Sequence, residues 1–244
     1  MSSPIVVIPA RMASTRLPGK PLADIGGVPM IVQVWRRAME ADVGPVLVAV
    51  AEEEIAAAVR DHGGEAILTN PDLPSGSDRV MRAVRAYDPN RRYDVVVNVQ
   101  GDLPTLDPKL IHAALECLDS DPSIHLSTLI CEITRPEERE NPNVVKAIVG
   151  LAPGQTMGRA LYFTRAMAPT GEGPLYHHIG LYAFRRTALR AFISLPPAVL
   201  EQREKLEQLR ALENHMRVEA ALVDTVPLGV DTPADLERAR TLLA

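Results

Sequence analysis

The positively charged side chains near the start of the sequence are spaced as a phosphate-binding loop requires. Arg11, Arg16 and Lys20 fall within ten residues that also hold the hydroxyls of Ser14 and Thr15. Arginine binds phosphate oxygens through a planar fork, whereas lysine acts as a compact point charge. The segment therefore predicts a loop that wraps a triphosphate, although a solvated basic surface loop would have a similar composition.

Two common phosphate-binding motifs do not fit this segment. The pair Gly19-Lys20 is followed by Pro21 instead of Ser or Thr, and the upstream glycine of a P-loop is absent. No G-x-G-x-x-G pattern follows the first apolar run, which argues against a dinucleotide-dependent dehydrogenase.

Two aspartates are candidate metal ligands. Asp102 follows Gly101 just after the apolar run 95–99, and Asp231 comes shortly before Pro233 at the start of a final helical pattern. Mg²⁺ is usually held by one or two carboxylates together with substrate phosphates and water, so this pair suffices. A turn or helix-cap role is the alternative for each aspartate taken alone.

The elements that must position these groups alternate between strand and helix over the first half of the chain. Apolar runs at 5–8, 46–50 and 95–99 predict buried parallel strands, and helical spacing in 30–40 and 53–61 predicts helices between them. We therefore expect an α/β fold with a doubly wound, mostly parallel sheet and helices on both faces. Ligands bind beyond the carboxyl ends of such strands, where the basic loop begins.

The alternation ends at about residue 126. Strand-like runs at 126–133, 144–148, 159–164 and 179–184 predict a small mixed-sheet lobe. A helix-rich stretch, a last strand and a capped terminal helix follow at 200–215, at 219–223 and from 232 onward.

The composition argues against a nucleic-acid-binding or membrane-surface protein. Of 244 residues, 46% are hydrophobic, and 26 basic against 31 acidic side chains give a net charge of −5. Broad binding to such polyanions needs a basic excess. Cys117 and Cys131 have neither metal nor disulfide spacing, and the N-terminal apolar run is too short for a signal peptide. We therefore expect buried thiols, no membrane association and a cytoplasmic location.

Eight motifs, in order along the chain, resemble those of 3-deoxy-manno-octulosonate cytidylyltransferases. They are Ile8-Pro9-Ala10-Arg11 through Pro21, Ser75-Gly76-Ser77-Asp78-Arg79, Asn98-Val99-Gln100-Gly101-Asp102, Asn141-Pro142-Asn143, Leu161-Tyr162-Phe163-Thr164-Arg165, His178-Ile179-Gly180-Leu181-Tyr182, Leu206-Glu207-Gln208-Leu209-Arg210 and Gly229-Val230-Asp231-Thr232-Pro233. The first motif also occurs in altered form in sialic acid cytidylyltransferases, whereas the full set is specific.

The resemblance implies a homodimeric, Mg²⁺-dependent enzyme that transfers CMP from CTP to 3-deoxy-D-manno-octulosonate (Kdo) for lipopolysaccharide synthesis. It implies a single nucleotidyltransferase domain over residues 1–244. Within it we expect a nucleotide-binding half at about 1–125, a sugar-binding and dimerisation lobe at about 126–218, and a closing strand and helix at 219–244.

The same resemblance implies roles for individual residues. The CTP side comprises Ala10, Arg11, Arg16, Lys20, Ser75, Arg79 and Gln100. The metal ligands are Asp102 and Asp231, which form the catalytic set together with Arg11 and Lys20. The acid sugar is surrounded by Gln100, Arg165, His178, Tyr182, Glu207 and Gln208. Of these, Arg165 suits the sugar carboxylate, and the others suit its hydroxyls.

Plainer structural roles stay open for several of these residues. His178 and Tyr182 share one face of a strand and could be half-buried sheet residues. Glu207 and Gln208 could be solvated helix residues. His178 is a candidate general base by residue type, and no side chain stands out as a dedicated one.

The chain departs from the family pattern at four points. Leu103 follows Asp102 where Glu is frequent, and Ala51-Glu52 stands where Thr-Asp is frequent. Thr170 replaces a frequent Trp, and His177 replaces a frequent Arg. A cytidylyltransferase for a related acid sugar, such as amino-Kdo or a sialic acid, is therefore the nearest alternative. A nucleotide-binding regulatory protein that has lost catalysis is the second.

Overall fold

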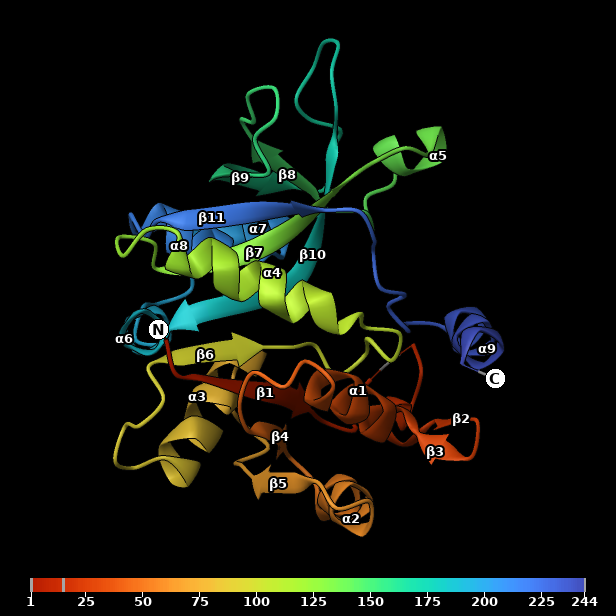
Figure 1. The fold of residues 1–244 in the computed structure, drawn as a ribbon. Coiled ribbons are helices and arrows are strands. Elements are labelled where there is room, and N and C mark those ends of the chain that lie inside the picture. The colour runs from red at the N-terminus through yellow and green to blue at the C-terminus, as the bar shows by residue number, and fades with distance from the viewer. Residues whose placement is uncertain (1, 15, 244) are drawn as a thin grey trace. The chain divides into compact units, whose positions relative to one another are not determined.

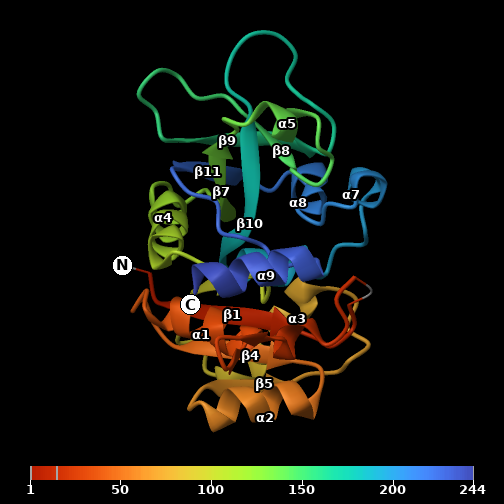
Figure 2. The same ribbon diagram turned by 90° about the vertical axis from the view of Figure 1, so that its right-hand side faces the viewer.

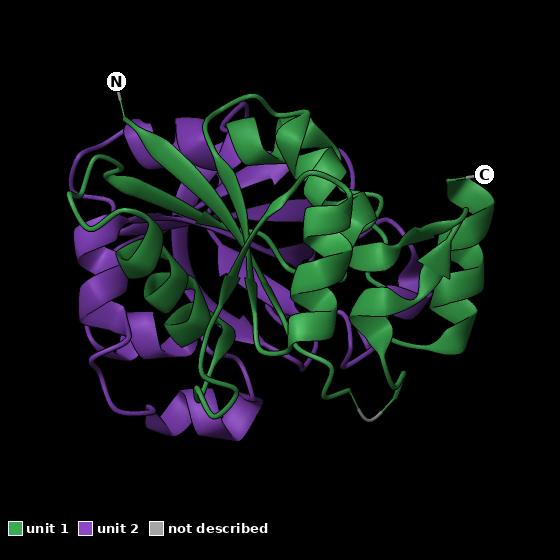
Figure 3. Cartoon of the chain, turned by 90° about the horizontal axis from the view of Figure 1, so that it is seen from below, with its two compact units in different colours: residues 1–112, 227–244 green, residues 113–226 purple. Residues whose placement is uncertain are grey.

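The computed structural model describes residues 2–14 and 16–243, so Thr15 of the expected phosphate loop lies outside the described residues. The chain forms two compact units, which Figure 3 colours separately. Unit 1 comprises residues 1–112 and 227–244, and unit 2 comprises residues 113–226. Both units combine helices with β-sheet, as expected for a mixed α/β protein.

Unit 1 is built on a sheet of parallel strands (Figure 1). The strands lie in the order β5 (Glu65–Leu68), β4 (Val46–Val50), β1 (Pro4–Ala10) and β6 (Val95–Asn98). Val6 of β1 lies opposite Val46 on one side and Val97 on the other. Because β4 and β6 are buried along their whole length, their sequences are continuous apolar runs instead of alternating ones.

Three helices pack on this sheet, namely α1 (Met30–Met39), α2 (Glu53–Asp61) and α3 (Gly76–Tyr87). α1 contacts α2, β1 and β4, whereas α3 contacts β1, β4 and β5. Figure 2 shows α2 beside β5. The helices expected at 30–40 and 53–61 are confirmed. α3 begins at Ser75, whose hydroxyl accepts a hydrogen bond from the Asp78 amide.

The C-terminal helix of the chain packs with N-terminal elements of unit 1. These elements are η1 (Lys20–Leu22) and the hairpin of β2 (Asp24–Ile25) and β3 (Val28–Pro29), and the helix is α9 (Pro233–Leu242). Ile25, Met30 and Leu236 are members of the small buried cluster that joins them. α9 begins with a capping box between Thr232 and Asp235, which confirms the predicted cap.

Unit 2 contains a mixed sheet. Its strands lie in the order β10 (Tyr176–Arg185), β7 (Leu126–Glu132), β11 (Val218–Val223), β9 (Met157–Thr164) and β8 (Lys146–Val149). β11 is parallel to β7, whereas β10 with β7, β10 with β8, β11 with β9 and β8 with β9 are antiparallel. β8 also pairs with β10 at Tyr176 and His177, so the sheet closes on itself.

The helices around this sheet are short. They are α4 (Pro108–Asp119), whose first residues belong to unit 1, then α5 (Pro136–Arg139), α6 (Arg186–Phe192), α7 (Val199–Glu204) and α8 (Leu209–Glu213). The helix-rich stretch expected over 200–215 consists of two short helices, α7 and α8, separated by a turn. Lys205 adopts a left-handed conformation (φ 59°) that ends α7, and the following turn buries Leu206 and Gln208.

The two cysteines are free thiols. Cys117 is buried as expected, and burial raises its pKa to about 12. The expectation for Cys131 is wrong, because this side chain is only half-buried at the end of β7. Among the residues that the structure describes, no helix is long and apolar enough to cross a membrane.

Candidate active site

The loop at residues 11–19, between β1 and η1, carries the charges that the sequence singles out. Gly19 adopts a left-handed conformation (φ 69°) that favours glycine, and it places Lys20 at the first position of η1. Within the loop the Leu17 amide donates to the Ser14 hydroxyl over 3.4 Å. These contacts give the loop a defined path into η1.

Glu52 holds the first part of this loop. The Met12 amide donates to its carboxylate over 3.0 Å, and the Ala51 amide beside it donates to the Ala10 carbonyl over 3.2 Å. β1 and β4 end next to each other, with Ala10 opposite Val50, so the chain after β4 reaches the loop directly. The departure from the family pattern at residue 52 therefore has a structural role.

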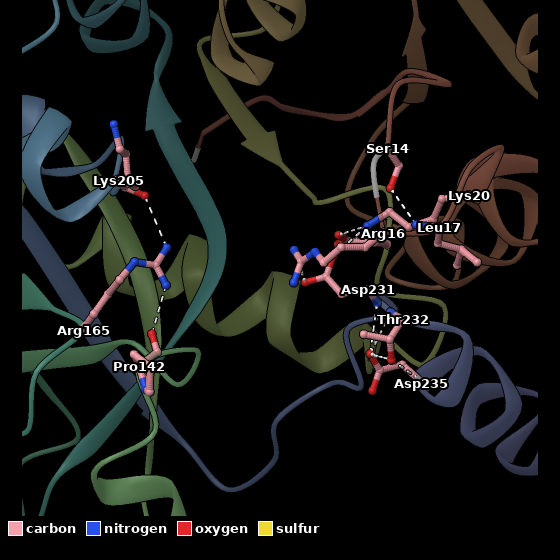
Figure 4. Close-up of polar contacts among 11 residues, drawn as sticks. Ser14, Arg16, Leu17, Lys20, Pro142, Arg165, Lys205, Asp231, Thr232 and Asp235 are labelled. Carbon is pink, nitrogen blue, oxygen red and sulfur yellow. Dashed lines mark hydrogen bonds and ion pairs between the residues drawn. The ribbon is translucent and has the colours of Figure 1, made fainter.

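Lys20 lies between the two expected metal ligands. Its Nζ is 2.8 Å from Oδ2 of Asp102 and 3.1 Å from Oδ1 of Asp231, and Figure 4 labels Lys20 together with Asp231. Arg16 pairs with the other oxygen of Asp231 at 3.1 Å. Burial alone would lower the pKa of Lys20, but the charges and hydrogen bonds of the two carboxylates raise it above its ordinary value. Two cations and two anions thus form a compact charge cluster.

Backbone packing brings the two aspartates together. A Cβ on Gly101 would lie 2.8 Å from the Pro9 carbonyl oxygen, so glycine allows the turn before Asp102 to pack closely against β1. The Val230 amide donates to the Asp102 carbonyl over 2.9 Å, which fixes the segment that carries Asp231. This convergence of distant segments is what the sequence alone did not show.

The two carboxylates could hold a divalent cation. The Lys20 ammonium already occupies a point within hydrogen-bonding distance of both. Mg²⁺ commonly takes one or two protein carboxylates and completes its shell with phosphate oxygens and water, which fits this donor set. In the described part of the chain, no group of three or more His, Cys, Asp or Glu side chains could hold a metal ion.

An open pocket of about 150 Å³ lies beside the loop. It is lined by Pro9, Ala10, Arg11, Leu73, Ser75, Gly76, Arg79 and Gln100. Five of the residues expected on the CTP side are therefore brought together around one hollow. Arg11 is exposed there, so its guanidinium is accessible to a ligand.

Two of these residues have structural partners of their own. The Ser75 hydroxyl donates to the Asp78 carboxylate over 2.7 Å as part of the cap of α3. The Arg79 side chain is buried, and burial lowers its pKa. Its guanidinium donates to the Thr69 hydroxyl and to the carbonyls of Asn70 and Pro71. Arg79 therefore shapes the pocket wall more than it offers a free charge.

In unit 2, backbone carbonyls orient the guanidinium of Arg165 (Figure 4). Nε donates to the Glu204 carbonyl over 2.8 Å, Nη1 to the Pro142 carbonyl over 3.0 Å and Nη2 to the Lys205 carbonyl over 3.5 Å. The Arg165 amide and the Thr164 hydroxyl both donate to the Glu204 carboxylate, over 3.0 and 2.9 Å. Carbonyl partners fix a guanidinium without neutralising it, so Arg165 keeps its charge for a ligand.

His178 is buried between two polar side chains. Its Nε2 lies 2.9 Å from the Thr128 hydroxyl, and its Nδ1 lies 3.4 Å from the Gln208 amide nitrogen. The Thr128 hydroxyl also lies 3.1 and 2.9 Å from the carbonyls of Ile179 and Leu181, which can only accept. With its one proton on a carbonyl, Thr128 accepts from Nε2–H, and Nδ1 accepts from Gln208.

This arrangement requires a neutral imidazole. Burial, and then the charge of His177, lowers the pKa of His178 to about 3. Nε2 already carries the ring proton, and the one basic lone pair, on Nδ1, accepts from Gln208, so the ring is not free to take a proton from a ligand. His178 is therefore suited to orienting Gln208 and not to general-base catalysis.

Tyr182 and Glu207 lie close to the same ring. The ring centroids of Tyr182 and His178 are 5.7 Å apart. Burial, and then the charge of Glu207, raises the pKa of Tyr182, so the phenol stays protonated. Glu207 is half-buried, 3.9 Å from the Arg210 guanidinium. Gln208 is buried in the turn between α7 and α8, so the solvated-helix alternative is wrong for it.

The structure places the expected metal and CTP-side residues in unit 1 and, apart from Gln100, the expected sugar-side residues in unit 2. It adds Thr128, Lys146 and Glu204 to the polar network of unit 2. Thr128 and Lys146 are polar residues within the strand-like runs 126–133 and 144–148, and that is the signal that could have found them. Glu204 carries no such signal, because it follows several other charged helix residues.

Known proteins resemble this chain along nearly its whole length. The cytidylyltransferase family model matches residues 5–218. A 3-deoxy-manno-octulosonate cytidylyltransferase from Rhodospirillum rubrum is 78% identical over 242 residues, which are 99% of this chain and 96% of that protein. One from Paramagnetospirillum magneticum is 66% identical over 241 residues, 99% of this chain and 98% of that protein. The solved structure of a CMP:2-keto-3-deoxy-manno-octonic acid synthetase complexed with CTP has a TM-score of 0.89 and 38% identity, covering 99% of this chain and 98% of that one.

Proposed function

Because the chain belongs to the family of the 3-deoxy-manno-octulosonate cytidylyltransferases, we propose that it transfers CMP from CTP to Kdo and releases pyrophosphate. The product, CMP-Kdo, is the activated sugar for lipopolysaccharide synthesis. The observation that carries the proposal is the convergence of Arg16, Lys20, Asp102 and Asp231 in one charge cluster, while Arg11 from the same loop lines the pocket. Such a cluster suits a bound triphosphate.

In the proposed reaction the anomeric hydroxyl of the sugar attacks the α-phosphorus of CTP. The new O–P bond forms as the bond to the β-phosphate breaks, pyrophosphate leaves, and the hydroxyl proton passes to solvent. Both reactants are anions, so charge neutralisation and positioning are the main tasks of the protein. Arg11, Arg16 and Lys20 take the first task by binding the triphosphate and the leaving pyrophosphate.

Asp102 and Asp231 are the proposed Mg²⁺ ligands. When bound, the ion would withdraw charge from the α-phosphate and so favour the departure of pyrophosphate. The support is that carboxylates from distant parts of unit 1 face the same cation. Without the ion, Lys20 neutralises the pair and keeps the two carboxylates from repelling each other.

The pocket of unit 1 is the proposed place of the nucleotide. Its residues Ala10, Ser75, Arg79 and Gln100 combine backbone, hydroxyl, guanidinium and amide groups. A nucleoside offers hydroxyls and a base edge with both donors and acceptors, which such a lining can match.

The sugar-side residues of unit 2 suit a polyhydroxylated carboxylate. Arg165 binds the carboxylate in this proposal, because its charge is oriented but not neutralised. In this proposal Gln100, Tyr182, Glu207 and Gln208 bind the hydroxyls, and His178 acts on the sugar side by orienting Gln208. The general base that residue type suggests for His178 is not part of the proposal, since both ring nitrogens are occupied.

We also propose that the sheet of unit 1 is doubly wound. From β1 the chain passes through α1 to β4 and through α2 to β5, and it then passes through α3 to β6 on the other side of β1. Right-handed crossovers would place α3 on the opposite face from α1 and α2, giving a doubly wound sheet. The proposed division has a nucleotide-binding half, a sugar-binding and dimerisation lobe, and a closing segment at the C-terminus. The exposed side chains of Leu161 and Val199 support a homodimer through unit 2, and a CTP-dependent reaction suits the cytoplasm.

Pyrophosphate release tests the reaction directly. Purified protein would be incubated with CTP, Mg²⁺ and a panel of acid sugars, namely Kdo, its amino analogue and a sialic acid. UTP in place of CTP and an EDTA control would run beside it. We expect release that requires Kdo, CTP and the metal.

Other outcomes would change the proposal in defined ways. Release with another acid sugar alone would keep the reaction and move the substrate. No release with any sugar, from folded protein that binds CTP, would contradict an enzymatic function and favour a regulatory one.

A further inference from the structure

Lys146 is a fully buried lysine at the first position of β8, outside every group discussed for catalysis. Its Nζ donates to the carbonyls of Asn141 (2.8 Å), Val144 (2.8 Å) and Arg165 (3.4 Å). An ammonium has three N–H donors, whereas a neutral amine has two. Three carbonyl acceptors therefore match the charged form.

The charge of Lys146 is not cancelled by a carboxylate. Within the described residues, no ion pair to Lys146 is found, and its partners are all backbone carbonyls. Its neighbour His177, directly opposite on β10, senses that charge. Burial first, and then Lys146 and Arg135, lower the pKa of His177 to about 4. Unit 2 thus contains a buried positive charge, the ammonium of Lys146, among backbone carbonyls.

The three carbonyls connect Lys146 to Arg165 by two routes. One is direct, since the third acceptor is the Arg165 carbonyl itself. The other is the turn 141–144, because Asn141 and Val144 flank Pro142, whose carbonyl accepts from Nη1 of Arg165. Lys146 therefore holds both the main chain of Arg165 and the turn that orients its guanidinium.

The guanidinium keeps donors for a ligand after these contacts. Of the five N–H groups of Arg165, three donate to carbonyls, which leaves one N–H on each terminal nitrogen. Two such donors are what a carboxylate accepts in a bidentate pair. The side chain is half-buried, so a ligand can reach it.

We propose that Lys146 is a positioning residue for the carboxylate of the acid sugar, acting through Arg165. Its buried ammonium holds the turn 141–144 and the Arg165 main chain so that the two remaining guanidinium donors face the ligand. Its charge adds to the positive potential that attracts the carboxylate. This inference rests on the proposed role of Arg165 in sugar binding.

A double-mutant cycle tests whether Lys146 acts through Arg165. Lys146→Met keeps the length of the side chain and removes its charge and donors. We expect it to raise the KM for the acid sugar about tenfold or more, with the KM for CTP nearly unchanged. In an Arg165→Ala background, Lys146→Met should change the sugar KM little further. Lys109→Met, at an exposed position, is the matched control and should behave as the wild type.

The results separate this inference from the proposed function. A wild type that uses no acid sugar would contradict the function and the inference with it. A wild type that uses the sugar would leave Lys146 to be judged by the variants. Equal rises in the KM of both substrates, or effects of Lys146→Met and Arg165→Ala that simply multiply, would overturn its role.

A measurement on the wild type covers the case in which Lys146→Met does not fold. The chain has four lysines, so ¹⁵N-lysine spectra are simple, and Lys109→Met assigns one of the four signals. We expect two protected ammonium signals, from Lys20 and Lys146. The signal that persists in Lys20→Met should shift when the acid sugar is added, but not with a neutral sugar of similar size. If the ammonium signal of Lys146 does not shift when the acid sugar is added, the proposal is overturned.

Discussion

Two pairs of positively charged side chains, one pair in each unit, have partners of different kinds. In unit 1, Lys20 and Arg16 pair with the carboxylates of Asp102 and Asp231. In unit 2, Arg165 donates from its side chain to backbone carbonyls alone, as Lys146 does. A carboxylate cancels the charge that it binds, whereas a carbonyl directs the same donor and leaves its charge intact. The two units therefore prepare their cations for different ligands.

Exposure follows the same division. The side chains of Arg16 and Asp231 are 61% and 47% exposed, whereas Lys146 is fully buried. Ion pairs at such exposed positions contribute about 0–1 kcal/mol, so a triphosphate can displace them at little cost. The carbonyl contacts in unit 2 have no competing anion to release. Unit 1 thus suits a site in which charges are exchanged during the reaction, and unit 2 suits one in which a single charge stays in place.

The largest expected effect is that of Asp102→Asn in unit 1. The amide keeps the size of the side chain but removes one charge from the Lys20 cluster and one proposed metal ligand. We expect the rate of pyrophosphate release to fall at least about a hundredfold, and the Mg²⁺ concentration for half-maximal rate to rise. Asp61→Asn, at the exposed end of α2, is the control and should keep the wild-type rate. A near-normal rate for Asp102→Asn would sink the metal assignment.

Arg165→Ala tests the fixed charge of unit 2. Loss of a bidentate, charge-assisted contact should raise the KM for the acid sugar about thirtyfold, while the KM for CTP changes by less than about twofold. Steady-state kinetics with each substrate varied in turn gives both values. Arg203→Ala removes a charge from the exposed side of α7 and serves as the matched control. Equal losses for both ligands would mean that Arg165 supports the fold and not the sugar.

Acid should weaken unit 2 through its buried histidine. The pKa of His178 is lowered to about 3 in the folded chain, against about 6.5 when unfolded. Between these values the unfolded chain binds a proton that the folded chain does not. The stabilising contribution is therefore complete above pH 6.5 and is lost as the pH falls below it.

His178 alone should lower the free energy of unfolding by about 2 kcal/mol between pH 7 and pH 5, and His177, whose pKa is lowered to about 4, should add to the same loss. Urea unfolding at several pH values measures it. His178→Asn should show a shallower dependence over that range, because it lacks the titrating ring. If the unfolding free energy of the variant depends on pH as steeply as that of the wild type, His178 is protonated in the folded protein. The buried polar network of unit 2 would then exchange charge as the cluster of unit 1 does.

The elements that sequence patterns predicted well are those decided by local spacing. The buried strands of unit 1 read as continuous apolar runs because both faces of a parallel sheet are covered. The helix-rich stretch at 200–215 is interrupted for a non-local reason. Lys205 turns left-handed so that Leu206 and Gln208 can enter the interior of unit 2, and nothing in the neighbouring residues requires that turn.

The candidate site divides in the same way. The charges of the phosphate loop and the two aspartates stand out by residue type, so the sequence could select them. The partners that orient Arg165 are backbone carbonyls, which every residue has, and they leave no mark in the sequence. The contact between Thr128 and His178 depends on the pairing of β7 with β10, which spacing along the chain does not reveal.

The smallest expected effect concerns Glu52, a carboxylate of unit 1 that accepts a hydrogen bond from a backbone amide of the phosphate loop. Glu52→Ala removes the acceptor for the Met12 amide, so the phosphate loop loses an anchor. A hydrogen bond of this kind is worth about 1 kcal/mol, and we expect the KM for CTP to rise about fivefold. Glu52→Gln keeps an acceptor oxygen and should leave the KM for CTP near the wild-type value.

The pair of substitutions separates geometry from charge. If Glu52 acts only as an acceptor, the glutamine variant binds CTP as the wild type does, and Glu54→Ala on the exposed face of α2 does the same. If its negative charge matters, glutamine should tighten CTP binding, because one repulsive charge near the phosphates is gone. A loss as large in Glu52→Gln as in Glu52→Ala would fit neither case. It would show that the phosphate loop depends on the negative charge of Glu52. Unit 1 would then rely on a charge even at a contact with a backbone amide.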